Sequence, residues 1–325
     1  MISKMQDLRI SEAVQGLLRC PRCKSKLGVT SDLLVCASPE CRAHFPVVDG
    51  VPVLLNEDAS IFSVDDVLSQ RDSTLHPRRS RIGRILRRLV PGISSKIKSK
   101  PNIEKLTNLL LSQSPASRVL VVGGRTLGQG MAPLVRNPAV ELVETDVAFG
   151  PRTMLICDAH DIPFADESFD AVIAQAVLEH VADPYRCVDE IHRVLKEQGL
   201  VYAETPFMVQ VHLAPYDFTR FTHLGLRRLF RRFDELESGA AYGPGMALAW
   251  AYQYFLWSFT SSKTLRRLLM VFARLASFYL KYFDYYLIDK AGTLDAASGY
   301  YFLGRKGERV LSDRELIRLY RGAKR

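Results

Sequence analysis

The sequence predicts an α/β protein with a doubly wound, mostly parallel sheet of seven strands, a small N-terminal β module and an apolar helical insertion before the last strand. Residues 115–240 alternate short apolar strands with helices, which is the pattern of a parallel sheet. Residues 170–174 are apolar and β-branched, as in a strand covered on both faces. Asp183 then provides an N-cap, and Pro184 occupies the first position of a helix that continues to Lys196.

The length and composition are those of one large domain with a smaller one. The chain has 325 residues, and its hydrophobic fraction of 47% is ordinary for a globular protein. Residues 71–105 hold 11 basic and two acidic residues. The net charge of this segment, +9, equals the net charge of the whole chain. This segment favours an anionic partner without making the fold itself basic. The first residues lack the apolar core of a signal peptide, so we expect a cytoplasmic protein.

We expect five regions along the chain. Residues 1–60 form a zinc-ribbon-like module, and residues 61–110 form a basic linker with an amphipathic helix. Residues 111–240 form the α/β core, residues 241–297 an apolar and aromatic helical insertion, and residues 298–325 a closing strand and a terminal helix. Ser312 and Glu315 have the spacing of a capping box at the start of that helix.

Four of the six cysteines form two close pairs in the N-terminal region. The pairs are Cys20 with Cys23 and Cys36 with Cys41, separated by twelve residues. Four thiolates in this arrangement suit one tetrahedral Zn²⁺, which is structural because no coordination position stays open. Cys157 and Cys187 fall on a predicted strand and helix, so we expect them in the core.

A nucleotide-type site is predicted at the ends of three strands. The first strand ends at Gly123 and Gly124, a turn in which the backbone can approach a ligand closely. The second strand ends at Asp146, 23 residues after Gly123, a separation that suits a carboxylate holding ribose hydroxyls. The third strand is followed by Asp158. The alternative for the glycine loop alone is a plain strand-to-helix turn.

Residues 169–184 resemble the fourth strand and following helix of class I S-adenosylmethionine-dependent methyltransferases of type 11. The resemblance covers residues 115–240 and the closing strand, and it implies that S-adenosylmethionine is the cofactor. It places Gly123, Gly124, Arg125, Asp146, Asp158, Ala159 and Gln175 in the cofactor site, with Asp158 on the adenine amino group. The loop departs from the family's Gly-x-Gly-x-Gly pattern, because Arg125 and Leu127 stand where glycines are usual. Arg125 either pairs with the methionine carboxylate or obstructs the pocket.

The N-terminal region resembles the short zinc-ribbon-like proteins that activate tRNA and protein methyltransferases. The matching residues are 18–23 and 45–52, within a stretch of about 40 residues. The alternative is four ordinary thiols without a metal.

Methyl transfer to a hydroxyl needs an aligned acceptor and a base. The candidates for the base are His180 and His212, the latter within a polar and aromatic segment, residues 212–221, that suits a glycan or another small polar acceptor. The alternative for each histidine is a packing role. We therefore expect O-methylation of a glycan, a lipid-linked precursor or a related small molecule.

Two segments have the composition of membrane-surface helices. Residues 238–262 carry no charge, and Arg267, Arg274 and Lys281 then recur every seven residues among aromatic side chains. An amphipathic helix is also predicted upstream, with an apolar face and a basic face; the apolar face is formed by Ile82, Ile85, Leu86, Leu89 and Val90. Either both segments pack on the core, or they place the protein on the inner face of an anionic membrane.

Two other functions fit the same sequence. An RNA methyltransferase would use the zinc module and residues 78–100 to bind phosphates, but that stretch lacks interleaved aromatics, so nucleic acid is the less favoured partner. A non-catalytic scaffold would keep the fold without binding cofactor. The sequence sets no oligomeric state.

Overall fold

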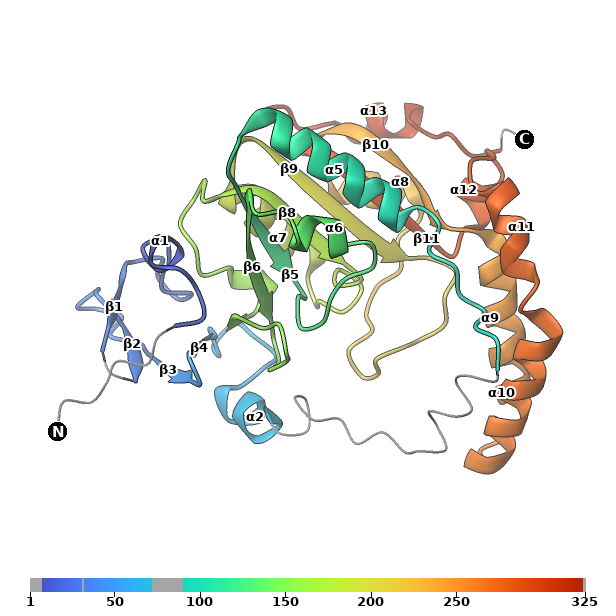
Figure 1. Ribbon diagram of the computed structural model, residues 1–325, viewed down its shortest axis with the longest axis horizontal. Coiled ribbons are helices and arrows are strands. Elements are labelled where there is room, and N and C mark those ends of the chain that lie inside the picture. Colours follow the sequence, from blue (N-terminus) through green and yellow to red (C-terminus); the bar gives the residue numbers. More distant parts are fainter. Residues whose placement is uncertain (1–7, 31, 72–89, 324–325) are drawn as a thin grey trace.

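The computed structural model describes residues 8–30, 32–71 and 90–323 (Figure 1). Eleven strands in these residues form one sheet in the order β1-β2-β3-β4-β7-β6-β5-β8-β9-β11-β10. The strands are β1 (Leu27–Val29), β2 (Leu33–Cys36), β3 (His44–Val48), β4 (Val51–Leu54), β5 (Ser117–Val122), β6 (Val140–Asp146), β7 (Leu155–Cys157), β8 (Phe169–Gln175), β9 (Leu195–Pro206), β10 (Phe233–Tyr242) and β11 (Gly299–Lys306). The helices are α1 (Glu12–Gln15), α2 (Val64–Ser69), α5 (Ser99–Gln113), α6 (Ala132–Val135), the 3₁₀ helix η1 (Ala159–Asp161), α7 (Pro184–Val194), α8 (His223–Leu229), α9 (Pro244–Trp257), α10 (Lys263–Ser277), α11 (Leu280–Leu287), α12 (Thr293–Ala296) and α13 (Asp313–Arg318).

The core sheet is doubly wound, as predicted. Strands β7, β6, β5, β8 and β9 run parallel to one another, whereas β11 pairs antiparallel with both β9 and β10. From β5 the chain winds outward through β6 and β7, and it then returns to place β8 on the other side of β5. Ligands of such sheets bind outside the carboxyl ends of the strands at this reversal.

The prediction of a seven-stranded sheet is wrong in its extent, because the four strands of the N-terminal module continue the sheet to eleven. Strand β4 pairs in parallel with β7, with Val53 opposite Ile156 and Leu54 opposite Cys157. An edge strand such as β7 has backbone groups that need partners, and β4 provides them. This pairing joins segments about 100 residues apart, so no local pattern could reveal it.

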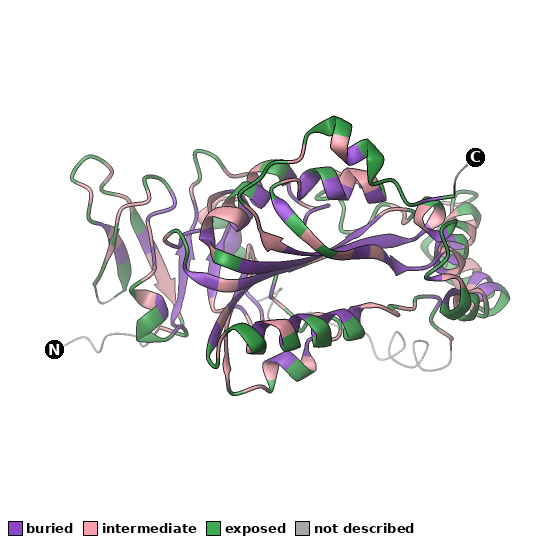
Figure 2. Ribbon diagram, turned by 90° about the horizontal axis from the view of Figure 1, so that it is seen from above, coloured by how far each residue is buried: buried purple, intermediate pink, exposed green. Residues whose placement is uncertain are grey.

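Helices cover both faces of the core sheet, which lies buried between them (Figure 2). On one face α7 and α8 pack on alternate strand residues, which include Leu120, Val172, Ala174, Val201 and Phe302. On the other face α5 and α6 pack on the intervening residues, which include Val119, Val121, Ile173, Tyr202 and Leu303. The two sets alternate along each strand because successive side chains point to opposite faces.

Helix α7 begins as its sequence predicts. The Asp183 carboxylate accepts hydrogen bonds from the backbone N–H groups of Tyr185 and Arg186, both at 3.1 Å, and Pro184 follows at the first helical position. The helix ends at Val194, earlier than the predicted Lys196, because Leu195 already pairs with Phe169 of β8. The predicted capping box of Ser312 and Glu315 is present at the start of α13.

Residues 244–296 form α9 to α12 between β10 and β11. The N-terminus of α9 is capped from α11: the buried Asp284 carboxylate accepts the N–H groups of Gly245 at 2.7 Å and Met246 at 2.9 Å. Arg274 of the predicted basic stripe faces α9, where its Nε donates to the side-chain oxygen of Gln253. No helix in the described residues is long and apolar enough to cross a bilayer. The predicted amphipathic helix that begins at Ile82 lies outside the described residues, apart from Val90.

Candidate active site

A cavity of about 540 Å³ lies at the carboxyl ends of β5, β6, β7 and β8. Five of the residues predicted for the cofactor site line it: Gly123, Arg125, Asp146, Asp158 and Ala159. His180 lines it as well. The cavity therefore occupies the crevice in which sheets of this topology bind ligands.

Gly123 makes the turn at the end of β5 in a conformation that other residues rarely adopt. Its φ is +74°, and a Cβ at this position would lie 2.4 Å from Cγ2 of Val177. A residue with a side chain would therefore have a strained backbone here and would collide with Val177. With glycine at this position, the backbone of the turn faces the cavity directly. Gly130, beyond the altered part of the loop, also has a positive φ, and a Cβ there would lie 2.7 Å from Cα of Lys100 in α5.

Asp146 stands at the end of β6 with both carboxylate oxygens already oriented. One accepts the backbone N–H of Arg125 at 3.2 Å, and the other accepts that of Ala148 at 3.0 Å. Burial raises the pKa of Asp146, and the charge of Arg125 opposes this rise. Each oxygen keeps a lone pair for a hydroxyl of a ligand. The Arg125 side chain packs against Gly150, and a Cβ on that glycine would collide with Cγ of Arg125. Leu127 is exposed and lies outside the cavity lining.

Asp158 is held by a buried network at the end of β7. One oxygen accepts the backbone N–H of His160 at 3.0 Å and its ring Nδ1–H at 2.5 Å, and the other accepts the Ser60 hydroxyl at 2.5 Å. Nε2 of the same ring accepts the backbone N–H of Asp183 at 3.0 Å, so the imidazole is neutral with its proton on Nδ1. Burial alone would raise the pKa of Asp158, but the hydrogen bonds from His160 and Ser60 outweigh it and lower that pKa.

The segment that follows the N-terminal module forms one wall of the cavity, which the sequence did not suggest. Ile61, Phe62, Val67 and Gln70 line the cavity. The Phe62 ring also lies 5.4 Å from the ring of Tyr216, which belongs to the loop after β9. Together with the Ser60 contact to Asp158, these residues connect the module directly to the site.

Two residues predicted for the cofactor site lie beside the cavity lining. Gly124 packs behind the turn, where a Cβ would lie 2.9 Å from Cβ of Glu144. Gln175 donates from Nε2 to the backbone oxygen of Gln129 at 3.0 Å and to the buried carboxylate of Glu204 at 3.1 Å. Its amide therefore stabilises the loop and the end of β9.

The two histidines predicted for the acceptor lie together at the mouth of the cavity. The ring centroids of His180 and His212 are 4.9 Å apart, with the planes at 81°. The loop that carries His212 is fixed by Arg220, whose guanidinium makes a two-pronged contact with the Asp217 carboxylate. Glu179 lies between the rings, with Oε1 at 3.7 Å from Nε2 of His180 and at 3.8 Å from Nε2 of His212. The nearby Glu179 carboxylate raises the pKa of His212. Sequence reasoning missed Glu179, although it directly precedes His180.

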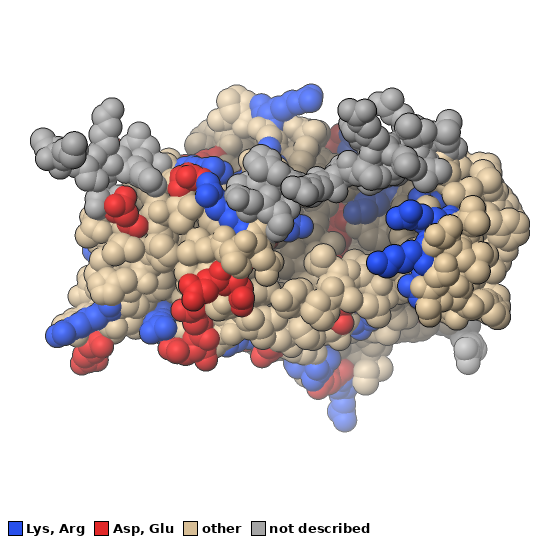
Figure 3. All heavy atoms as spheres, turned by 90° about the horizontal axis from the view of Figure 1, so that it is seen from below, with Lys and Arg blue, Asp and Glu red and all other residues tan. Residues whose placement is uncertain are grey.

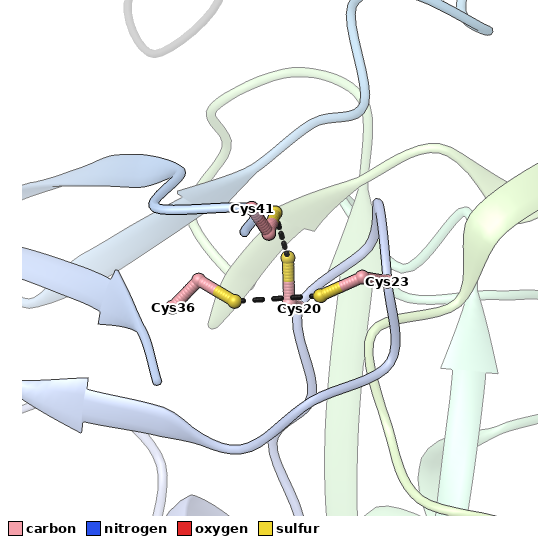
Figure 4. A group of neighbouring side chains, drawn as sticks. All are labelled: Cys20, Cys23, Cys36 and Cys41. Carbon is pink, nitrogen blue, oxygen red and sulfur yellow. Dashed lines mark hydrogen bonds between the residues drawn. The ribbon is translucent and has the colours of Figure 1, made fainter. Parts of the chain in front are cut away.

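The four N-terminal cysteines converge as predicted (Figure 4). Their sulfurs lie within 4.8 Å of one another, with Cys20 to Cys41 at 3.8 Å and Cys23 to Cys36 at 3.4 Å. Zn–S bonds of about 2.3 Å place the sulfurs of a tetrahedral site about 3.8 Å apart, so the arrangement fits zinc. Hydrogen bonds with Ser25 lower the pKa of Cys23, whereas burial raises the pKa of Cys20 and of Cys36. Cys157 and Cys187 are buried in the core, and burial raises the pKa of each thiol.

Comparison with known proteins gives separate matches for the two parts of the chain. Residues 131–203 match the family described as methyltransferase domain. A 44-residue stretch is 48% identical to a demethylmenaquinone methyltransferase of Clavibacter sepedonicus, covering 14% of this chain and 18% of that protein. At the N-terminus, 63 residues are 42% identical to a UPF0434 protein of Azoarcus sp. (strain BH72), covering 19% of this chain and 92% of that protein.

Two further matches have lower sequence identity. An uncharacterised 37.1 kDa protein of transposon TN4556 from Streptomyces fradiae is 32% identical over 101 residues, which are 31% of this chain and 26% of that protein. The chain thus spans about a quarter or less of the length of these two curated relatives, the transposon protein and the menaquinone enzyme. A solved phosphoethanolamine N-methyltransferase 2 of Haemonchus contortus in complex with S-adenosyl-L-methionine is 14% identical, with a TM-score of 0.41 over 79% of this chain and 62% of that one.

Proposed function

We propose that this chain, which belongs to the class I S-adenosylmethionine-dependent methyltransferases and carries an N-terminal module of the UPF0434 family, transfers a methyl group from S-adenosylmethionine to an oxygen atom of a glycan, a lipid-linked precursor or a related small molecule. The observation that carries the proposal is the cavity, where a glycine turn and two carboxylates at successive strand ends face the same space. Asp146 would hold the ribose hydroxyls with one lone pair left on each oxygen, and Asp158 would hold the adenine amino group with the lone pair left on the oxygen that accepts Ser60.

The acceptor would enter beside His180 and His212, because these residues lie at the mouth of the cavity. The cofactor supplies a methyl group on a sulfonium, which is a good leaving group. The chain's own residues then have to orient the acceptor hydroxyl in line with that carbon, keep water out and remove a proton. The loop of residues 207–222 is suited to this task because the Asp217–Arg220 contact holds it in one conformation.

The first test separates cofactor binding from turnover. We expect wild-type protein to bind S-adenosylhomocysteine at one site in calorimetry, and His212→Ala to keep that affinity within about twofold, since His212 lies outside the cavity lining. Methyl transfer to a glycan or lipid-linked acceptor pool, followed with a radiolabelled methyl donor, should fall about 10²–10⁴-fold in this variant, the usual contribution of an acid–base group. If the wild type does not bind S-adenosylhomocysteine, the proposal is wrong and the chain is better described as a non-catalytic scaffold. If the His212→Ala variant turns over at the wild-type rate, His212 has no role in the reaction.

We further propose that α9 to α11 rest on an anionic membrane surface. Large apolar side chains on these helices and on the connection between α9 and α10 are exposed: Leu248, Phe255, Phe259, Leu268, Phe272, Leu275, Tyr282, Phe283, Tyr285 and Tyr286. Figure 3 shows an extended uncharged surface at this end of the molecule, with Lys and Arg at its border. Exposed apolar areas of this kind occur at interaction surfaces, and basic neighbours favour anionic lipid.

The position of α9 connects this surface to the acceptor loop. The hydroxyl of Tyr254 in α9 donates to the backbone oxygen of Val211 at 3.2 Å, one residue before His212. A lipid-linked acceptor would therefore have its polar head near the histidines while its chain stays in the membrane. This supports a lipid-linked precursor among the acceptors named above.

Vesicle binding tests the membrane proposal. Wild-type protein should float with vesicles of phosphatidylglycerol and phosphatidylcholine, and more weakly with phosphatidylcholine alone. The triple variant Phe255→Ser, Phe259→Ser, Phe272→Ser should bind more than about tenfold more weakly, because each inserted Phe contributes on the order of 1.5–3 kcal/mol. The control is Ile317→Ser, which removes an equally exposed apolar side chain from α13. Equal flotation of the triple variant and the control would contradict the proposal.

A further inference from the structure

Glu179, His180 and His212 bring three metal-ligating atoms to one point outside the cysteine cluster. One carboxylate oxygen and one nitrogen from each ring all lie within 4.8 Å of one another. The separations of 3.7 and 3.8 Å from Glu179 Oε1 to the two Nε2 atoms are longer than hydrogen bonds. They fit two ligands of one ion, which with bonds of about 2.2 Å lie at most about 4.4 Å apart.

The carboxylate of Glu179 accepts no hydrogen bond in the described part of the chain, and its nearest charged neighbours are the rings of His180 and His212. Its side chain is fully buried, and neither of its oxygens accepts a hydrogen bond. The residue is nevertheless fixed in place, since its backbone oxygen accepts the N–H groups of Phe218 at 2.8 Å and Thr219 at 3.2 Å. A buried carboxylate that accepts no hydrogen bond is costly, so its position favours a positive charge between it and the histidines.

Both histidines present Nε2 to this point. Nδ1 of His180 lies 2.5 Å from the backbone oxygen of Tyr216 and donates its proton there, so in the neutral ring the lone pair is on Nε2. Nδ1 of His212 lies 3.3 Å from the backbone oxygen of Gln210, 3.6 Å from the Asp217 carboxylate and 3.3 Å from a guanidinium nitrogen of Arg220. A ring nitrogen held by a backbone carbonyl, as in His180, is typical of histidines that bind a metal through the other nitrogen.

We propose that Glu179, His180 and His212 bind one divalent cation of the Mn²⁺ or Zn²⁺ type at the mouth of the cavity, and that this cation holds the acceptor. The second part rests on the proposed function. Three protein ligands leave coordination positions open, and the half-exposed His212 places them toward the acceptor. An acceptor with two neighbouring oxygens, such as a vicinal diol, suits two such positions.

The cation would assist the transfer by favouring the ionised hydroxyl. The acceptor hydroxyl loses its proton to solvent when it is coordinated. Its lone pair then forms the oxygen–carbon bond while the sulfur–methyl bond breaks, and the bonding electrons stay on sulfur as the neutral thioether. In this arrangement His212 is a cation ligand, so its loss lowers turnover through the lost cation.

Mn²⁺ titration followed by electron paramagnetic resonance tests the site without cofactor or acceptor. Hard Mn²⁺ discriminates against the thiolates of the cysteine cluster, so zinc-loaded full-length protein should bind one Mn²⁺ per chain. Glu179→Gln, which keeps the side-chain shape, and His212→Ala should each weaken that binding at least about tenfold. Glu197→Gln, a change of the same chemistry at an exposed position, should leave it unchanged.

Two results would overturn the inference: no bound Mn²⁺ in the wild type, or equal affinity in Glu179→Gln, His212→Ala and the control. In the first case a protonated His212 paired with Glu179 supplies the positive charge. Calorimetry with S-adenosylhomocysteine shows whether each variant is folded. It also separates the two proposals, since cofactor binding without Mn²⁺ removes only the cation site and Mn²⁺ binding without cofactor removes only the transferase.

Discussion

Replacing Asp146 by alanine should weaken the binding of S-adenosylhomocysteine about 100-fold, the largest effect that we expect for one cavity residue. Two hydrogen bonds from ribose hydroxyls to a carboxylate contribute about 3 kcal/mol together, which corresponds to that factor. The substitution also leaves the N–H groups of Arg125 and Ala148 without their acceptor, so the loop at the cavity edge loses its anchor. Calorimetry on the purified variant measures the change.

The matched control is Asp189→Ala. Asp189 is an exposed carboxylate on α7 that pairs with Arg232 at 3.0 Å, far from the cavity lining. The Asp189→Ala variant should bind S-adenosylhomocysteine as tightly as the wild type does. It should also lose little stability, because exposed ion pairs contribute about 0–1 kcal/mol. An Asp146→Ala protein that keeps the wild-type affinity would show that the cofactor does not rest on this carboxylate.

Replacing Cys36 by serine should remove the thiolate-bound zinc and unfold the N-terminal module. The small strands β1 to β3 bury little apolar surface of their own, and zinc binding of about 10–16 kcal/mol is folding free energy in such modules. A mercurial thiol reagent should release one zinc ion per chain from the wild type. We expect it to release almost none from the Cys36→Ser variant. We also expect weaker binding of S-adenosylhomocysteine, because Ser60 at the end of the module donates to Asp158, and Phe62, which follows the module, lines the cavity.

Cys187→Ala is the control for thiol loss. Cys187 is buried in α7 outside the cluster, so its substitution costs packing but should leave the releasable zinc at one per chain. If Cys36→Ser keeps its zinc, the four cysteines do not form the site. If it loses zinc but binds cofactor with full affinity, the module does not support the cavity wall.

Much of the core could be predicted because its signals are local. Strand β6 ends at Asp146 and β7 ends one residue before Asp158, and both are short segments rich in β-branched and aliphatic residues. Asp183 with Pro184 starts α7 through contacts within three residues. The two residues of each cysteine pair likewise lie close together in the sequence, within one turn, so their spacing indicated one metal site. These features depend on neighbours in the chain, which is why pattern and spacing were sufficient.

The sequence by itself determined the strand and helix order, the cysteine cluster and the two carboxylates of the cavity. Only the tertiary structure decided that β4 joins β7, that Ser60 reaches Asp158, that Asp284 caps α9 and that Glu179 meets His212. Each of these contacts joins segments about 30 to 100 residues apart. They arise from the way layers pack on one another, and the free energy that selects them comes from burying surfaces and pairing polar groups across the fold rather than from the preference of any short stretch.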